Sequence, residues 1–377
     1  MNSRRRLATV SVLSFLTAWA TCWPLHADEQ TPGGPFAESL STKNSAGLPR
    51  TAQPSQAEGP QSPADNTVPL FRVVEHGKWG YMDRNGKIVI SPEYYDAYPF
   101  TEGLALIQPF HVIGSRAIRV SIIDKNGKMV GSKIYSQAQA FSEGLALVEI
   151  AGEEKWGLGY IDQTGKMVIS QEYKKASSFK EGLAAIAVAD KWGYIDKSGR
   201  TVIPAQFSDA HSFAEGLASV EIDRQWGYID KTGKMIIPPR FEMAYDYTEG
   251  LAAVKAGGKW GFIDNTGQMV IAPQFSDAYG FSEGLAQVKE GSKWGYIDKA
   301  AKMVIPPQYD KSYKHAEGMA AVKAGRKWGF VDKAGKMVIP AQYDDVLSFS
   351  NGLAEVSVGK KWGYIDNTGK YVWEPTK

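Results

Sequence analysis

A Trp-Gly pair recurs along most of the chain, and its spacing constrains the fold more than any other feature. The last six pairs are 34 residues apart, and a degenerate ninth copy lies at residues 120–130, where Val120-Ser121 replaces Trp-Gly. A fixed period of this length is typical of repeat architectures. The pairs begin at Trp79, Trp156, Trp192, Trp226, Trp260, Trp294, Trp328 and Trp362.

Each repeat unit contains three short apolar segments that predict β-strands. In the unit 251–284, the second and third segments are joined by Asp264-Asn265-Thr266-Gly267. This pattern favours a type I turn followed by a glycine in the left-handed region, which closes a three-residue hairpin. The turn aspartates are Asp83, Asp124, Asp162, Asp196, Asp230, Asp264, Asp298, Asp332 and Asp366, and after Asp298 the glycine position holds Ala301.

The apolar pattern predicts that the units stack face to face. Runs such as Met269-Val270-Ile271 are apolar at consecutive positions, which indicates a strand covered on both faces. The first unit (70–90) and the last (ending near 373) each hold three strands, so no strand is left to complete a blade at the other terminus. The sequence therefore predicts an all-β fold of nine three-stranded β-meander repeats of about 34 residues, stacked as an open superhelical array, with a closed β-propeller as the alternative. A loop aromatic, as in Phe213, Phe281 and Phe349, is expected to fill the seam between units.

The N-terminal residues predict export. Arg4 to Arg6 precede an apolar stretch from Leu7 to about Ala20, and Ala27 offers a small residue for cleavage, so residues 1–27 are interpreted as a signal peptide. Residues 28–69 are rich in Pro, Ser and Gly and predict a disordered linker before the repeat domain at 70–377. Lipidation of Cys22 is not expected, because Trp19 stands where lipoprotein signals carry Leu. The expected location is periplasmic or extracellular, without a transmembrane segment.

Composition excludes several function classes. Removal of residues 1–27 takes away three of 43 basic residues and the only cysteine, which leaves 40 basic against 41 acidic residues, a net charge of −1. Such a chain is not expected to bind nucleic acid or to contain disulfides. The remaining histidines, at 76, 111, 211 and 315, are too scattered for a metal site, and no nucleotide-binding or nucleophile motif occurs, so no cofactor or metal is expected.

The pattern K-W-G-Y-I-D-x-x-G-K-M-V-I-P resembles the WG-repeat (KWG repeat) family of bacterial secreted and surface proteins. The resemblance covers roughly residues 70–377. It implies a β-repeat scaffold that serves as an interaction module, with no shared catalytic residues. The sequence departs from the pattern where Leu158-Gly159 is inserted and where His111 to Arg119 extend the second unit.

Three columns of equivalent residues have both a structural and a functional interpretation. The tryptophans are predicted to form the repeat core, the alternative being a ladder that stacks on a ligand. The aspartates are predicted to order turns, the alternative being a calcium ladder. A third column precedes Gly and is predicted to accept hydrogen bonds that order loops, the alternative being an acidic groove: Glu102, Glu143, Glu181, Glu215, Glu249, Glu283 and Glu317.

The sequence thus predicts a non-catalytic secreted scaffold that binds a protein or a glycan through the long face of its array, with an unknown binding site and oligomeric state. One alternative is a hydrolase of cell-wall or extracellular polymer, with its site where the pattern breaks: the 111–119 extension, His315, or Asn351 in the Glu column. Another is a purely structural spacer. A closed ring would move binding to its centre and would favour the enzymatic alternative.

Overall fold

The computed structural model describes residues 68–109, 119–150 and 157–376. The chain divides into two units, Met1–Gly59 and Pro60–Lys377, and every described residue lies in the second. The predicted signal peptide with Cys22, almost all of the predicted linker, Trp156 and most of the 111–119 extension lie outside the described residues. Within them, no helix is long and apolar enough to cross a membrane.

The described residues form nine antiparallel sheets, numbered here as blades 1 to 9 in chain order. In each blade the strands lie side by side in the order of the sequence. Blade 1 comprises β1 (Phe71–Glu75), β2 (Lys78–Met82) and β3 (Ile88–Tyr94), and blade 2 comprises β4 (Asp96–Ala97), β5 (Leu104–Gln108) and β6 (Ser121–Asp124). Blade 3 comprises β7 (Tyr135–Ala138), β8 (Leu145–Ile150), β9 (Leu158–Asp162) and β10 (Met167–Tyr173). Blade 4 comprises β11 (Leu183–Val188), β12 (Lys191–Asp196) and β13 (Thr201–Phe207).

Blades 5 to 9 are the most regular part of the molecule, and each has four strands. Blade 5 comprises β14 (Asp209–Ala210), β15 (Leu217–Ile222), β16 (Gln225–Asp230) and β17 (Met235–Phe241), and blade 6 comprises β18 (Met243–Ala244), β19 (Leu251–Ala256), β20 (Lys259–Asp264) and β21 (Met269–Phe275). Blade 7 comprises β22 (Asp277–Ser282), β23 (Leu285–Glu290), β24 (Lys293–Asp298) and β25 (Met303–Tyr309), and blade 8 comprises β26 (Lys311–Ser312), β27 (Met319–Ala324), β28 (Lys327–Asp332) and β29 (Met337–Tyr343). Blade 9 comprises β30 (Asp345–Val346), β31 (Leu353–Val358), β32 (Lys361–Asp366) and β33 (Tyr371–Thr376).

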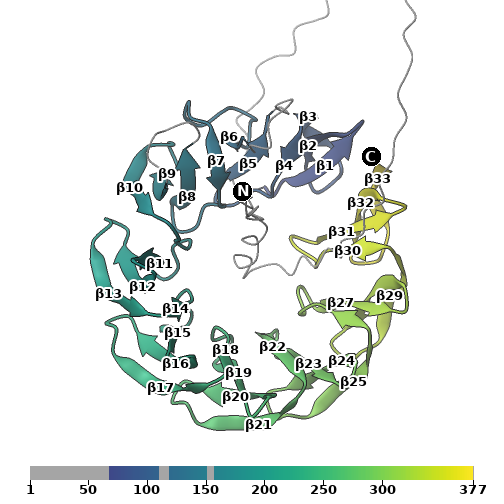
Figure 1. The fold of residues 1–377 in the computed structure, drawn as a ribbon. Helices are drawn as coiled ribbons and strands as arrows, with labels where there is room; N and C mark the ends of the chain where they lie inside the picture. Colours follow the sequence, from purple (N-terminus) through teal and green to yellow (C-terminus); the bar gives the residue numbers. More distant parts are fainter. Residues whose placement is uncertain (1–67, 110–118, 151–156, 377) are drawn as a thin grey trace, which may run out of the picture. The chain divides into compact units, whose positions relative to one another are not determined.

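The nine blades form a closed β-propeller, so the predicted open superhelical array is wrong. Figure 1 shows the ring, with β18 and β22 on its inner side, β17 and β21 on its outer side, and blade 9 beside blade 1. The open array was predicted because no strand remained to complete a blade at the other terminus. The ring closes without such a strand, because blade 9 packs on blade 1 through side chains.

The core consists of nine apolar clusters, one at each interface between neighbouring blades. One blade contributes large side chains and the next blade contributes mainly small ones, so the two faces interlock. Between blades 6 and 7 these are Leu251, Ala253, Trp260, Phe262, Ile271 and Phe275 against Ala278, Phe281, Ala286, Val288 and Ile297. The ninth cluster joins Leu353 and Tyr364 of blade 9 to Phe71, Val73 and Met82 of blade 1, which closes the circle.

The predicted three-stranded meander is also incomplete. In six of the nine sheets of the described residues, part of the connection between units forms a fourth strand at the inner edge, in most cases of only two residues. The loop aromatics behave as expected. Phe213, Phe281 and Phe349 are buried at the interfaces, each inclined or edge-on to an aromatic ring of the preceding blade.

The glycine of the Trp-Gly pair lies beneath a bulge in the third strand of its blade. In blade 6 the pairing register shifts between Trp260↔Phe275 and Phe262↔Ile271. A Cβ atom on Gly261 would lie 2.4 Å from the Ile271 carbonyl oxygen and 2.8 Å from the Pro273 nitrogen. Only glycine permits this approach of two backbones.

We therefore expect Gly261→Ala to lower the free energy of unfolding by about 3 kcal/mol, as overpacking against backbone does. Gly257→Ala is a suitable control in the same blade, because a Cβ there meets nothing within 4 Å and only the positive φ of 60° opposes it. Its cost should be about 1 kcal/mol. Urea unfolding of both variants checks the difference, and equal midpoints would contradict the steric role of Gly261.

Candidate functional site

The tryptophan column lies mostly at the blade interfaces. Trp192, Trp260, Trp294 and Trp328 are buried, whereas Trp79, Trp226 and Trp362 are half-buried. Trp260 and five of its equivalents pair across the sheet with the aromatic residue that ends the third strand, whereas Trp362 pairs with Thr376. This burial supports a packing role and leaves little of the tryptophan faces for a ligand.

The aspartate column orders the turns between the second and third strands. In all nine blades, one Asp carboxylate oxygen accepts hydrogen bonds from the backbone N–H groups two and four residues later. Where Ser or Thr follows at the second position, its hydroxyl also donates and lowers the pKa of the aspartate, as at Asp162, Asp196, Asp230, Asp264 and Asp366. Ala301 adopts φ 63° at the position that glycine occupies elsewhere. Among the described residues, no group of three or more His, Cys, Asp or Glu could hold a metal ion.

The glutamate column links consecutive blades from blade 2 to blade 9. Glu249 and Gly250 form a two-residue hairpin turn, both with positive φ, and the Glu249 carboxylate accepts a hydrogen bond from the N–H of Gly284 in the following blade, 3.0 Å away. The same bond recurs from Glu102, Glu143, Glu181, Glu215, Glu283 and Glu317 to the next blade. Glutamate is unfavourable in the left-handed region of backbone conformation. The backbone of these residues is therefore locally strained, and the hydrogen bond to the next blade offsets this strain.

Lysines complete several of these links. Lys197 pairs with Glu143 at 3.0 Å, and Lys333 pairs with Glu283 at 3.2 Å. Burial raises the pKa of both glutamates, but the lysine and the glycine N–H outweigh it, so the pKa is lowered overall. The column ends at Asn351 of blade 9, where the next equivalent glycine position is Pro69, which has no N–H to donate.

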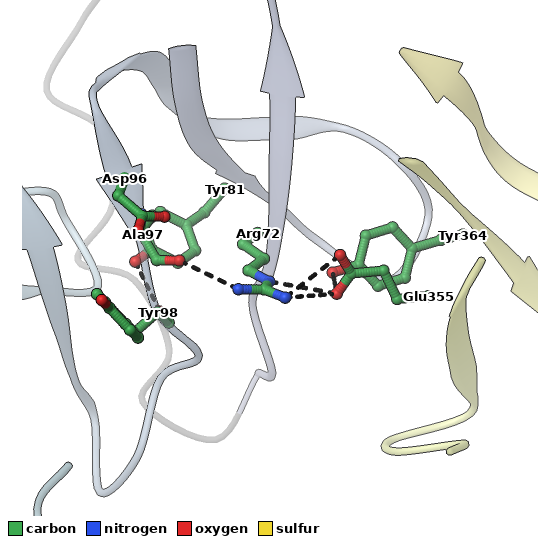
Figure 2. A network of polar contacts seen from close by, with 7 residues as sticks. All are labelled: Arg72, Tyr81, Asp96, Ala97, Tyr98, Glu355 and Tyr364. Carbon is green, nitrogen blue, oxygen red and sulfur yellow. Dashed lines mark hydrogen bonds and ion pairs between the residues drawn. The ribbon is translucent and has the colours of Figure 1, made fainter. Parts of the chain in front are cut away.

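A polar network stands at the point where the ring closes (Figure 2). Arg72 of β1 contacts the Glu355 carboxylate of β31 through Nε and Nη2, at 3.2 Å each, and its Nη1 donates to the Ala97 carbonyl at 3.4 Å. Tyr364 of β32 donates to the same carboxylate at 3.2 Å. Burial raises the pKa of Glu355, although Arg72 opposes the shift. Arg72 thus joins blades 9, 1 and 2 in one partly buried network.

The network replaces a hydrogen bond that a tyrosine makes with backbone in five other blades. Tyr194, Tyr228 and Tyr296 occupy the position of Tyr364, and each donates to a backbone carbonyl of the next blade. Sequence reasoning missed this network. The signal was present, because Arg72 and Glu355 have opposite charges at a register that holds Leu, Ala, Ser or Gln in the other units.

A second group missed by sequence reasoning lies at the inner edge of blades 5 to 8. The residue two positions after the start of the short inner strand is aromatic or His there, and it packs nearly parallel to the tryptophan of its own blade. The pairs are His211–Trp226, Tyr245–Trp260, Tyr279–Trp294 and Tyr313–Trp328, with ring centroids 4.7, 4.8, 5.4 and 4.9 Å apart. Tyr279 remains 39% exposed, and Tyr245 and Tyr313 are half-buried.

Two groups could in principle support catalysis. His211 Nδ1 lies 2.9 Å from Ser219 Oγ and 3.8 Å from Asp246 Oδ1. Both contacts fall on the same ring nitrogen, and Ser219 is fully buried. A nucleophile needs its base on one imidazole nitrogen and the orienting carboxylate on the other, so this group lacks the geometry of a catalytic triad.

His315 is the other group. It occupies the position of Phe281 and Phe349, is fully buried, and neither ring nitrogen has a hydrogen-bond partner in the described part of the chain. Burial lowers the pKa of His315, and the opposing effects of the Asp332 backbone and the Glu283 carboxylate do not offset it. His315 is therefore a buried neutral ring in a packing position.

We expect His315→Phe to stabilise the protein increasingly as the pH falls. With a pKa lowered in the folded state, His315 gains its proton first in the unfolded chain, so the wild type loses stability as the pH falls below about 6.5. The variant has no such group. Thermal unfolding of both proteins between pH 7.5 and 5 checks this, and a constant difference in Tm would contradict it.

Solved structures resemble the ring at low sequence identity. The crystal structure of a eukaryotic initiation factor aligns with a TM-score of 0.59 and 13% identity over 81% of this chain and 95% of its own, which shows the fold alone. The dihydro-heme d1 dehydrogenase NirN in complex with DHE gives 0.42 and 14% over 84% and 74%. PorZ, a surface component of the type-IX secretion system of Porphyromonas gingivalis, gives 0.33 and 11% over 78% and 44%. No curated protein matches the chain.

The repeats match one family model from the first blade to the last. The model, described as the WG containing repeat, matches residues 79–108, 121–156, 159–192, 192–224, 226–260, 260–294, 294–328 and 328–362. These matches include the degenerate second copy, and they confirm the resemblance predicted from the K-W-G pattern. The chain therefore belongs to the WG containing repeat family.

Proposed function

We propose that the propeller is a non-catalytic scaffold in the periplasm or outside the cell, where it binds a protein or glycan partner at the inner edge of its blades. One observation carries the proposal. The tryptophan, aspartate and glutamate columns serve interfaces, turns and links between blades. The residue two positions after the start of the inner strand is instead not the same in every blade, as His211, Tyr279 and Leu347 show, and it is partly exposed in these three. A position that varies while its scaffold repeats is typical of a binding surface.

The hydrolase alternative has less support. Catalysis by paired groups needs neighbouring residues in different environments, and the group around His211 lacks the required arrangement. His315 is buried without an exposed partner. A pure spacer would not need exposed or half-exposed tyrosines at four equivalent inner positions, which are Tyr98, Tyr245, Tyr279 and Tyr313.

Affinity capture tests the proposal. The immobilised full-length chain should retain a protein or a glycan from a bacterial envelope extract, and a retained polymer should be recovered at unchanged chain length. Recovery of shortened polymer would instead support the hydrolase, and no retention at all would support the spacer.

A further inference from the structure

The inner edge of blades 6 to 8 repeats one chemical group three times. Each blade contributes a tyrosine two positions after the start of its inner strand, a tryptophan behind it, and a lysine opposite that tryptophan on the neighbouring strand. The groups, called triads here, are Tyr245/Trp260/Lys255, Tyr279/Trp294/Lys289 and Tyr313/Trp328/Lys323. No other blade has this combination.

The triads present cations and tyrosine edges, and the tryptophans support them. Lys289 Nζ lies 5.5 Å from the Trp294 ring centre, and Lys323 Nζ lies 5.8 Å from that of Trp328. Tyr245 and Tyr279 stack on one another with centroids 6.0 Å apart, which joins the triads of blades 6 and 7. Their ring faces are thus covered, so hydroxyl groups and edges are available to a ligand.

Blade 8 adds further positive charge. Lys311 pairs directly with Lys323 across β26 and β27, and Lys311 and Lys314 are both exposed. Like charges at opposite positions of a strand pair are unfavourable unless an anion lies between or beside them. Three carboxylates lie nearby. Asp310 is held by Lys293 and the Gly325 N–H, and Asp345, which lies near Tyr313, accepts a hydrogen bond from the Val346 N–H. Burial raises the pKa of Asp277, which disfavours its negative charge.

We propose that this surface binds a linear anionic polysaccharide. This deepens and rests on the proposed function. Three equivalent groups on consecutive blades fit a ligand whose own units repeat, and each group contains a cation and a hydroxyl that can bond to sugar oxygens. An acidic protein segment shares the charge of such a polymer but has no regular repeat of ring hydroxyls, so the triads favour the polysaccharide.

Titration calorimetry with the full-length chain tests the proposal with four polymers. Two are anionic polysaccharides, alginate with carboxylate groups and phosphomannan with phosphate groups. The other two are dextran, a neutral polysaccharide, and poly-L-glutamate, an acidic peptide. At least one anionic polysaccharide should bind, with an affinity that falls as salt rises, and the other two polymers should not. Equal binding of poly-L-glutamate would overturn the proposal in favour of an acidic protein segment or charge alone. Absence of binding by both anionic polysaccharides would also overturn it. If the chain still retained an envelope component, the proposed function would stand.

Matched variants locate the surface. Lys311→Gln with Lys314→Gln should weaken binding about tenfold or more, whereas Lys174→Gln with Lys175→Gln, which removes the same charge from the inner edge of blade 4, should not. Tyr279→Ala should weaken binding similarly, and Tyr98→Ala, the equivalent exposed tyrosine of blade 2, should not. Equal losses within each matched pair would place binding elsewhere, and an unchanged Tm would show that each variant is folded.

Discussion

Arg72→Met should lower the free energy of unfolding by about 3–5 kcal/mol, because it leaves Glu355 as a buried charge without its cation. Glu355 is 6% exposed, and within residues 68–109, 119–150 and 157–376 Tyr364 is its one remaining hydrogen-bond donor. The double variant Arg72→Met with Glu355→Met should recover most of the loss, since replacing a whole buried pair with apolar side chains is often neutral. Urea unfolding of the single and double variants measures the coupling.

The pH dependence of Arg72→Met provides a second test. Without the guanidinium, burial raises the pKa of Glu355 further above its usual value of 4.5. A raised pKa in the folded state means that the stability is retained below the unfolded pKa and is lost as the pH rises through the folded pKa. The variant should therefore approach the wild type near pH 4 and differ most at pH 8. A loss of stability independent of pH would mean that Glu355 is not buried at the seam.

Trp260→Ala should cost about 3–5 kcal/mol, the usual range for deleting a buried tryptophan. Trp260 is 4% exposed and lies in the cluster between blades 6 and 7. Trp362→Ala is the matched control at the same repeat position, where the side chain is only half-buried, and its cost should be about 1–3 kcal/mol. Equal and negligible shifts in the denaturant midpoint would show that the tryptophans do not support the core.

Much of the local structure follows from short-range chemistry that a single repeat contains. The Asp-x-x-Gly pattern predicts its turn because the aspartate bonds to nearby backbone. The Trp-Gly pair predicts close packing because glycine alone permits the approach seen at Gly261. The loop aromatics predict the filled seams, and Phe281 is buried in the cluster between blades 6 and 7.

Closure of the ring depends on information that no single repeat contains. The angle between neighbouring blades is set by how the side chains on their two facing sheets pack together. Small differences in volume between Ala, Val, Phe and Trp side chains accumulate over nine interfaces. The two-residue inner strands are too short to give an apolar alternation, so residues such as Asp209-Ala210 read as loop. The tyrosines at the inner edge were missed for the same reason. Their role depends on the position of the inner strand, which the sequence did not predict.

The closed ring is tested most directly by a distance between its first and last blades. Spin labels at positions 78 and 361, which are equivalent exposed sites in blades 1 and 9, can be compared with labels at 225 and 259, the same sites in blades 5 and 6. Cys22 is replaced by serine in both proteins. In a closed ring, blades 9 and 1 are neighbours like any other pair, so the two distance distributions from double electron–electron resonance should coincide. An open array would place the first pair eight sheet spacings apart, about 80 Å, and a distribution near that value would contradict the propeller.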